Sequence, residues 1–209
     1  TLDSDAVNVA QLKALTQVVT DGATHFYSVN NTDATAGNYN NNGATGANAL
    51  AAGVGAQAAG TNSVAIGTST RARYENDVAI GTNAANNQVN SVAIGFNAVT
   101  NTFGGIAIGE GAVATNSGPA YSAMAIGRGA VANSNGGGIG WNLGPTLAMG
   151  QGAQALGFGA VAVGVSADLA NPVAATAQGS SAFGSSARAT NLHTTALGVN
   201  SRAGGSFAT

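Results

Sequence analysis

Hydrophobic and small residues recur along this chain with a period of 14 positions. The segment Val64–Gly67 reads Val-Ala-Ile-Gly, and the same four residues return at Val78–Gly81. A period this short is typical of one turn of a β-solenoid and is too short for paired-helix or propeller repeats. Six of the nine steps between the glycines that end such segments equal 14, and the other three are 18, 23 and 20, where these glycines are Gly53, Gly67, Gly81, Gly95, Gly109, Gly127, Gly150, Gly164, Gly184 and Gly198.

Neighbouring positions within each repeat differ in size. Ala stands two positions before the glycine in all ten segments, whereas large aliphatic residues dominate one and three positions before it. Successive side chains of a strand point to opposite faces, and a coil of 14 residues has room for two short strands and two bends. The space between such close strands admits little more than a methyl group. We therefore expect Ala and Gly inside the solenoid and the larger side chains outside it.

The outward aliphatic residues are expected to form a stripe along the solenoid. Soluble monomers rarely expose a contiguous apolar patch above a few hundred Å², so we expect further copies of the same chain to cover the stripe in a closed assembly. The alternative is a second layer of the same chain, for which we see no spare amphipathic segment of sufficient length. The predicted interface residues are Val64, Ile66, Val78, Ile80, Val92, Ile94, Ile106, Ile108, Met124, Ile126, Leu147, Met149, Val161 and Val163.

The N-terminal part differs in composition from the repeats. In residues 1–22, the pair Asn8 and Gln11 resembles a helix capping box, and Leu12, Leu15 and Val19 have the spacing of a short coiled coil. Asp21 and Gly22 are a plausible stop. This segment is therefore predicted to be helical.

Residues 23–47 and 48–209 complete the expected organisation. The first of these ranges is predicted to contain a strand at Thr24–Val29, followed by an Asn- and Gly-rich loop. The second is predicted to be the solenoid, with inserted loops near residues 116–121, 133–145 and 169–177.

Composition and charge exclude several classes of function. The chain has 209 residues, of which 32 are Gly and none is Cys, and its formal net charge is −2. Six Lys and Arg against eight acidic residues do not form the basic stripe that nucleic acids require. No run of about 18 apolar residues predicts a membrane-spanning helix, and Thr1–Asp5 lacks the pattern of a secretory signal.

Candidate chemistry is sparse, and we expect no catalytic residue, metal site or cofactor. His25 and His193 are far apart, and zinc sites need a cluster of ligands. Glu75 and Asp77 are the one close pair of carboxylates, and we expect them in a solvated turn rather than in the sheltered pocket that acid–base catalysis needs. Trp141, in the longest insertion, is expected to cover an apolar edge.

Repeat and N-terminal segment together resemble a known family. The Asn-Ser-Val-Ala-Ile-Gly repeat at 14-residue spacing is similar to the YadA-like head of the trimeric autotransporter adhesins of Gram-negative bacteria. The segment Asp5–Leu12, Asp-Ala-Val-Asn-Val-Ala-Gln-Leu, looks like the neck motif of that family. The resemblance implies an all-β, left-handed parallel β-roll that forms a homotrimer, with a short N-terminal helical neck whose contact residues are Val7, Val9, Leu12 and Leu15.

The resemblance also implies a function and a location. Such a head would be non-catalytic and would attach bacteria to host extracellular matrix or to host cells, and could mediate autoaggregation. It would lie on the bacterial cell surface, on a fibre whose outer-membrane anchor is absent from this fragment. Because the neck-like motif here precedes the head, we expect an internal fragment of a longer fibre.

Three other functions remain open at this point. A left-handed β-helix acyltransferase would use a histidine such as His193, although those enzymes resemble 18-residue rather than 14-residue coils. An ice-binding solenoid would need a regular outward array of Thr. A spacer that binds nothing would need only the repeat itself.

Overall fold

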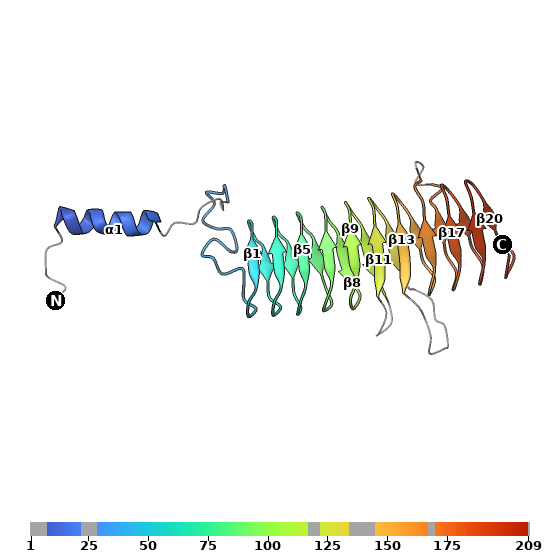
Figure 1. Ribbon diagram of the computed structural model, residues 1–209, viewed down its shortest axis with the longest axis horizontal. Coiled ribbons are helices and arrows are strands. Elements are labelled where there is room, and N and C mark those ends of the chain that lie inside the picture. The colour runs from blue at the N-terminus through green and yellow to red at the C-terminus, as the bar shows by residue number, and fades with distance from the viewer. Residues whose placement is uncertain (1–7, 22–28, 117–121, 134–144, 167–169, 209) are drawn as a thin grey trace. The chain divides into compact units, whose positions relative to one another are not determined.

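The computed structural model describes residues 8–21, 29–116, 122–133, 145–166 and 170–208 (Figure 1). These residues fall into two units, of which one ends at Thr32 and the other begins at Asp33. Val7, His25, Trp141 and nearly all of the expected strand Thr24–Val29 lie outside the described residues, as do most of the first two expected insertions.

The first unit contains the helix α1, Val9–Asp21. Its N-terminus is closed by the capping box expected from the sequence. The backbone N–H of Gln11 donates to Oδ1 of Asn8 at 3.0 Å, and the backbone N–H of Asn8 donates to Oε1 of Gln11 at 2.9 Å. These two bonds satisfy N–H groups that a helix otherwise leaves without partners.

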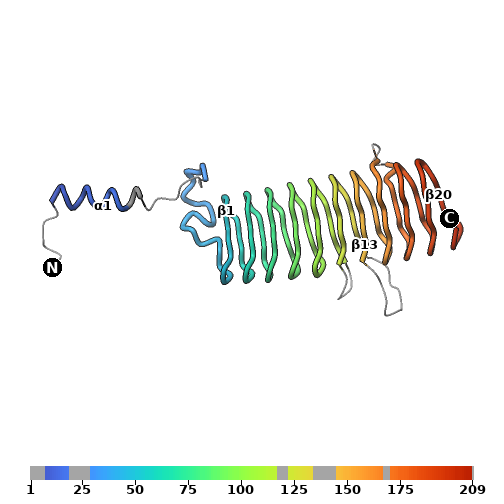
Figure 2. The backbone as a smooth tube through the Cα atoms, in the orientation of Figure 1, coloured from blue at the N-terminus to red at the C-terminus, as the bar shows by residue number. Residues whose placement is uncertain are grey.

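The second unit is an all-β solenoid of stacked coils, as expected (Figures 1 and 2). Each coil contributes one strand to each of two parallel ten-stranded sheets. The odd sheet consists of β1 (Leu50–Ala52), β3 (Val64–Ile66), β5 (Val78–Ile80), β7 (Val92–Ile94), β9 (Ile106–Ile108), β11 (Ala123–Ile126), β13 (Thr146–Met149), β15 (Val161–Val163), β17 (Ser181–Phe183) and β19 (Thr195–Leu197). The even sheet consists of β2 (Gln57–Ala58), β4 (Arg71–Ala72), β6 (Ala85–Asn86), β8 (Val99–Asn101), β10 (Val113–Thr115), β12 (Val131–Asn133), β14 (Gln154–Ala155), β16 (Ala174–Ala175), β18 (Arg188–Ala189) and β20 (Arg202–Ala203).

The strand register repeats every 14 residues in the regular coils and survives the insertions. Across the first insertion Ile108 pairs with Ile126, and across the second Met124 pairs with Leu147. The range expected for the third insertion includes β16, whose Ala175 pairs with Ala155. The extra residues therefore lie in the bends between strands, and equivalent side chains remain stacked in columns from one coil to the next.

The interior of the solenoid is filled by methyl groups. Twenty-seven residues form the buried apolar cluster, and all of them are Ala except Val173. Ala65, Ala79 and Ala93, which lie in the middle of β3, β5 and β7, have no exposed surface. Two sheets this close leave no room for Val or Ile between them, and the large aliphatic residues of the same strands therefore point outward.

The glycine at the end of each odd strand permits this close stacking. Gly81 has φ +123°, and a Cβ atom placed on it would lie 2.6 Å from the carbonyl oxygen of Gly95 in the next coil. Real Cβ atoms do not approach so near, and an L side chain rarely adopts this backbone conformation. The column can therefore contain only glycine at this position.

Asparagine side chains join successive coils at one bend. Asn48, Asn62, Asn76 and Asn90 occupy equivalent positions, and all have φ between 56° and 59°. Asn tolerates this left-handed conformation better than most residues. Their side-chain amides form a ladder, with N–O distances of 3.1, 3.3 and 2.9 Å between consecutive members.

The segment that precedes β1 packs on the first coil. Ala44 forms an isolated parallel bridge with Ala58. The side chain of Asn38 donates to the carbonyl oxygen of Gly53 at 2.7 Å and accepts from the backbone N–H of Gly55 at 2.6 Å. The N-terminal end of the sheet stack is therefore partly covered by its own chain.

Candidate functional site

The outward face of the odd sheet carries the predicted interface residues in two columns. We call these fourteen residues the apolar stripe, and they are Val64, Ile66, Val78, Ile80, Val92, Ile94, Ile106, Ile108, Met124, Ile126, Leu147, Met149, Val161 and Val163. Each pairs in register with its equivalents in the neighbouring coils. The fold thus brings onto one face residues that are spread over half of the sequence.

The apolar stripe is partly accessible in the single chain. Ile66 and Met149 are 37% and 40% exposed, and the other members are half-buried, whereas the Ala between each pair is fully buried. Each stripe residue rests on its neighbours in the same column, which leaves its outer surface in water. Such a continuous apolar strip is characteristic of an interaction surface rather than of a solvated face.

The stripe weakens toward the C-terminal end of the solenoid. Ser181 and Thr195 replace the aliphatic residue in one column, while Phe183 and Leu197 continue the other. Leu197 is 77% exposed, more than any stripe residue. The last two coils therefore offer less contiguous apolar surface than the coils before them.

The outward face of the even sheet has a different composition. Its first outward position is occupied by different residue types in the first five coils, namely Gln57, Arg71, Ala85, Val99 and Val113. One short polar ladder crosses this face, in which Arg73 donates to Asn87 and Asn87 donates to Asn101. The even sheet therefore lacks the uniform apolar columns of the odd sheet.

Asp77 does not lie in a solvated turn, and that expectation was wrong. Its side chain is fully buried inside the solenoid, in the column that holds Ser63 and Ser91 in the adjacent coils. The carboxylate accepts the backbone N–H of Tyr74 at 2.8 Å and that of Ser91 at 3.2 Å. Desolvation outweighs these hydrogen bonds and raises the pKa of Asp77 to about 6. Glu75, by contrast, is exposed.

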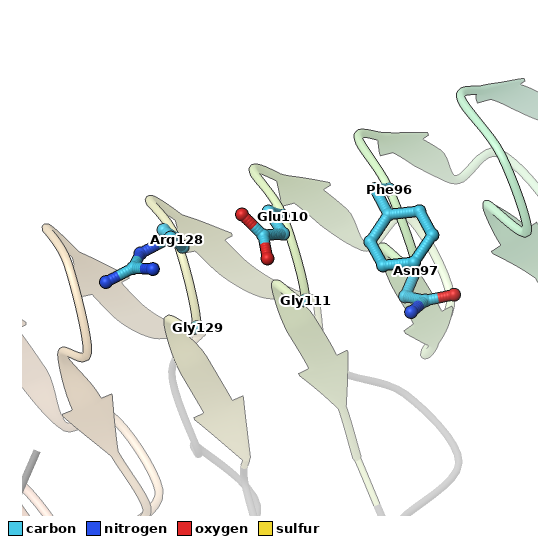
Figure 3. A pocket seen from close by; sticks show the side chains of 6 residues that line it. All are labelled: Phe96, Asn97, Glu110, Gly111, Arg128 and Gly129. Carbon is cyan, nitrogen blue, oxygen red and sulfur yellow. The ribbon is translucent and has the colours of Figure 1, made fainter.

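A small pocket lies along the bends that follow β7, β9 and β11 (Figure 3). Its volume is about 260 Å³, and its largest lining side chains are Phe96, Glu110 and Arg128, all of them exposed. They extend from equivalent positions of three consecutive coils, one residue after the turn glycine of each (Figure 3). The pocket has no sheltered pair of titratable groups of the kind that acid–base catalysis uses.

The predicted neck residues lie on α1 as far as they are described. Val9, Leu12 and Leu15 are 68%, 56% and 60% exposed, and Val18 is 68% exposed. A helix of 13 residues with its apolar side chains in water is marginal alone. This exposure is compatible with contact between helices of several chains.

His193 occupies a structural position rather than a chemical one. It stands at a bend with φ 53°, and its ring stacks on that of Phe207 with centroids 5.5 Å apart. Among the described residues, no group of three or more His, Cys, Asp or Glu could hold a metal ion. Within the same residues, no helix has the length and hydrophobicity to cross a bilayer.

Comparison with known families identifies the repeats. The family model of the YadA head domain repeat, which spans two copies, matches residues 44–70, 75–98, 175–201 and 189–209. The matched segments include coils from both ends of the solenoid. No curated protein matches the chain.

Proposed function

Because the solenoid of this chain is a YadA-like head domain of the trimeric autotransporter adhesin type, we propose that the chain acts as a surface-exposed adhesive head. In this proposal three copies assemble through the apolar stripe, and the resulting rod attaches bacteria to host extracellular matrix or host cells. It also mediates autoaggregation. The observation that carries the proposal is the continuous stripe of half-exposed Val, Ile, Leu and Met along one face of a tube whose own interior admits only small residues.

Energetics favour burial of this stripe. Full burial of one large aliphatic side chain contributes roughly 1.5–3 kcal/mol, so that fourteen such residues, each already half-buried, would add several kcal/mol per chain on assembly. A strip that runs along the tube is matched by the same strip on another copy, and a closed symmetric assembly leaves no copy of it exposed. Trimer formation is what the family implies for the number of copies.

A repetitive rod suits adhesion by many weak contacts. Equivalent positions recur on successive coils and, in a trimer, on three chains. Linked weak contacts can exceed the affinity of each one by orders of magnitude. The family also implies that such heads stand on the bacterial cell surface, on a fibre anchored in the outer membrane. A non-catalytic role agrees with the adhesin character of the family.

Assembly is tested by the mass of the purified chain in solution. Light scattering should give three times the chain mass for the parent. The double variant Val78→Asp, Ile80→Asp places charges in the stripe and should dissociate the assembly or prevent its folding. The matched control Ala85→Asp, Asn87→Asp introduces the same charges on the even sheet of the same coil and should remain trimeric. A parent that is monomeric and folded contradicts the proposal.

Adhesion is tested separately from assembly. The purified trimer is applied to surfaces coated with collagen, fibronectin or laminin, and its self-association is followed at rising concentration. Binding to at least one of these surfaces, or self-association, is expected. A folded trimer that binds nothing and does not self-associate would instead identify this domain as a spacer of the fibre.

A further inference from the structure

A second pocket lies at the C-terminal end of the solenoid and is lined by arginine. Its volume is about 340 Å³, and its lining residues are Asn171, Ser186, Arg188, Asn200 and Arg202. Arg188 belongs to β18 and Arg202 to β20, and the two residues pair in register on neighbouring strands. The pocket therefore presents two guanidinium groups about one strand spacing, roughly 4.8 Å, apart at their Cα atoms.

The positive charge of this pocket has no acidic counterpart among its lining residues. None of the five carries a carboxylate. Residues 170–209 contain two Arg and neither Asp nor Glu, and Asp168, the nearest acidic residue in the sequence, lies outside the described residues. In the other pair of arginines, by contrast, Arg73 donates to Asn87.

Two like charges in register on one face of a sheet repel each other. An anion between them removes this repulsion and gains charge-assisted hydrogen bonds from both groups. The planar guanidinium matches the geometry of sulfate, phosphate and carboxylate oxygens in a bidentate manner. Asn and Ser side chains supply further donors of moderate strength. The five lining residues thus have the chemistry of an oxyanion site.

The lining also indicates which source of oxyanions fits. All five side chains are polar, so the pocket offers no surface for an acyl chain. Arg188 and Arg202 occupy the outward column of the even sheet, on the opposite side of the tube from the apolar stripe. An assembly through the stripe leaves this sheet free to face an external polymer.

We propose that this arginine pocket binds the sulfate groups of a sulfated polysaccharide. This inference rests on the proposed function, since a polysaccharide of the host surface is a ligand only for an exposed adhesive head. Arg188 and Arg202 hold one sulfate ester between them, and Asn171, Ser186 and Asn200 contact its oxygens or the adjoining sugar hydroxyls. A trimer presents three such pockets, so a polymer with many sulfates binds by avidity.

The test compares two double variants of equal charge change in the full chain. Binding of a heparin-derived oligosaccharide is measured by calorimetry for the parent, for Arg188→Gln, Arg202→Gln, and for Arg71→Gln, Arg73→Gln. We expect the first variant to lose about tenfold or more in affinity, the equivalent of one charge-assisted hydrogen bond, and the second to stay within about twofold of the parent. Parent affinity should fall with rising salt.

Several outcomes would overturn the inference. Equal losses in both variants would show a general effect of net charge, and no binding by the parent would show that the pocket does not take sulfate. Binding to phosphatidylserine vesicles without binding to the oligosaccharide would assign the arginines to a membrane surface. Unchanged thermal unfolding of both variants controls for folding.

Failure of this inference is distinguishable from failure of the proposed function. If the parent adheres to matrix proteins and both variants adhere equally, the head is adhesive but the arginine pocket is not its polysaccharide site. If the oligosaccharide binds at Arg188 and Arg202 and no matrix protein or cell surface is bound, the pocket is an anion site in a chain that does not serve adhesion.

Discussion

The interior of the solenoid and the outward face of its odd sheet are built from alternate residues of the same strands, yet they follow opposite rules of size. In β5, Ala79 is fully buried while Val78 and Ile80 on either side of it are half-exposed. In an ordinary globular domain the larger side chains form the core. Here the tube is too narrow for them, and the apolar surface that would stabilise a core lies outside.

This inversion divides two tasks that one core usually combines. The interior, with its methyl groups and the hydrogen bonds between coils, determines the shape of the single chain. The apolar stripe contributes its remaining free energy only when a partner covers it. We therefore expect interior substitutions to damage the fold itself, and outward substitutions of similar size to be tolerated unless they introduce charge.

Enlarging an interior side chain should have the largest effect. Ala107 lies in the middle of β9 with no exposed surface. The substitution Ala107→Leu forces a larger side chain between the sheets and should lower the free energy of unfolding by more than about 3 kcal/mol. Denaturant unfolding at fixed protein concentration measures this.

The matched control for Ala107→Leu is Ile108→Leu, one residue along the same strand but outward. It conserves volume and should change the free energy of unfolding by less than about 1.5 kcal/mol. Equal stability of the two variants would mean that the tube widens at little cost and that its narrowness does not select Ala.

The turn glycines give the next largest contrast. Gly81→Ala places a Cβ 2.6 Å from the carbonyl oxygen of Gly95 at φ +123°, and should lower the free energy of unfolding by about 3 kcal/mol. Gly111 has φ +63°, and the position that an alanine Cβ would take there has no neighbour within 4 Å. Gly111→Ala should therefore reduce stability by only about 1 kcal/mol, the cost of the left-handed conformation. Thermal unfolding of both variants tests this, and equal losses would show that the close approach of coils is unimportant.

Asp77 tests whether a charge is tolerated inside the tube. Its pKa is raised from 3.8 to about 6 by burial, so the folded chain binds a proton more tightly than the unfolded chain. Stability is therefore full below about pH 4 and declines as the pH rises to about 6, by on the order of 2 kcal/mol. Asp77→Ser, which introduces the residue of the adjacent coils, should abolish this decline and raise stability at about pH 7.

The control for Asp77 is Glu75→Ser, which removes an exposed carboxylate from the same bend. This variant should retain the pH dependence of the parent in denaturant unfolding between about pH 4 and pH 7. If Asp77→Ser retains it as well, the buried carboxylate is not its source.

The sequence predicted the features that repeat and missed those that depend on a single residue. The period, the Ala column and the outward columns followed from counting positions, because every coil obeys the same steric rule. Asp77 was placed in solvent because it was considered beside Glu75, its neighbour in the chain. Its neighbours in the column, Ser63 and Ser91, would have indicated an inward position.

Pockets were also beyond prediction, because each combines residues from several coils whose bends differ. Arg188 and Arg202 stand at equivalent positions of consecutive repeats, which predicts that they share a column. That the bends at Asn171, Ser186 and Asn200 complete a pocket around them depends on an insertion whose path the repeat does not specify. The trimer interface and the neck contacts stay predictions until the assembly is measured.

The smallest expected effect belongs to the outer surface, at the asparagine ladder. Asn76 receives a hydrogen bond from Asn62 at 3.3 Å, donates one to Asn90 at 2.9 Å, and has φ 56°. Asn76→Ala removes both side-chain bonds and places Ala in the left-handed region, so it should lower the free energy of unfolding by about 1 kcal/mol or slightly more. Asn76→Gly removes the same bonds but relieves the backbone, and in thermal unfolding it should destabilise less than Asn76→Ala. Equal losses in the two variants would mean that the ladder acts through its side chains and that the backbone conformation adds no cost. No loss in either variant would contradict a stabilising role for the ladder, and would leave the contacts of the interior and the turn glycines to hold the coils together.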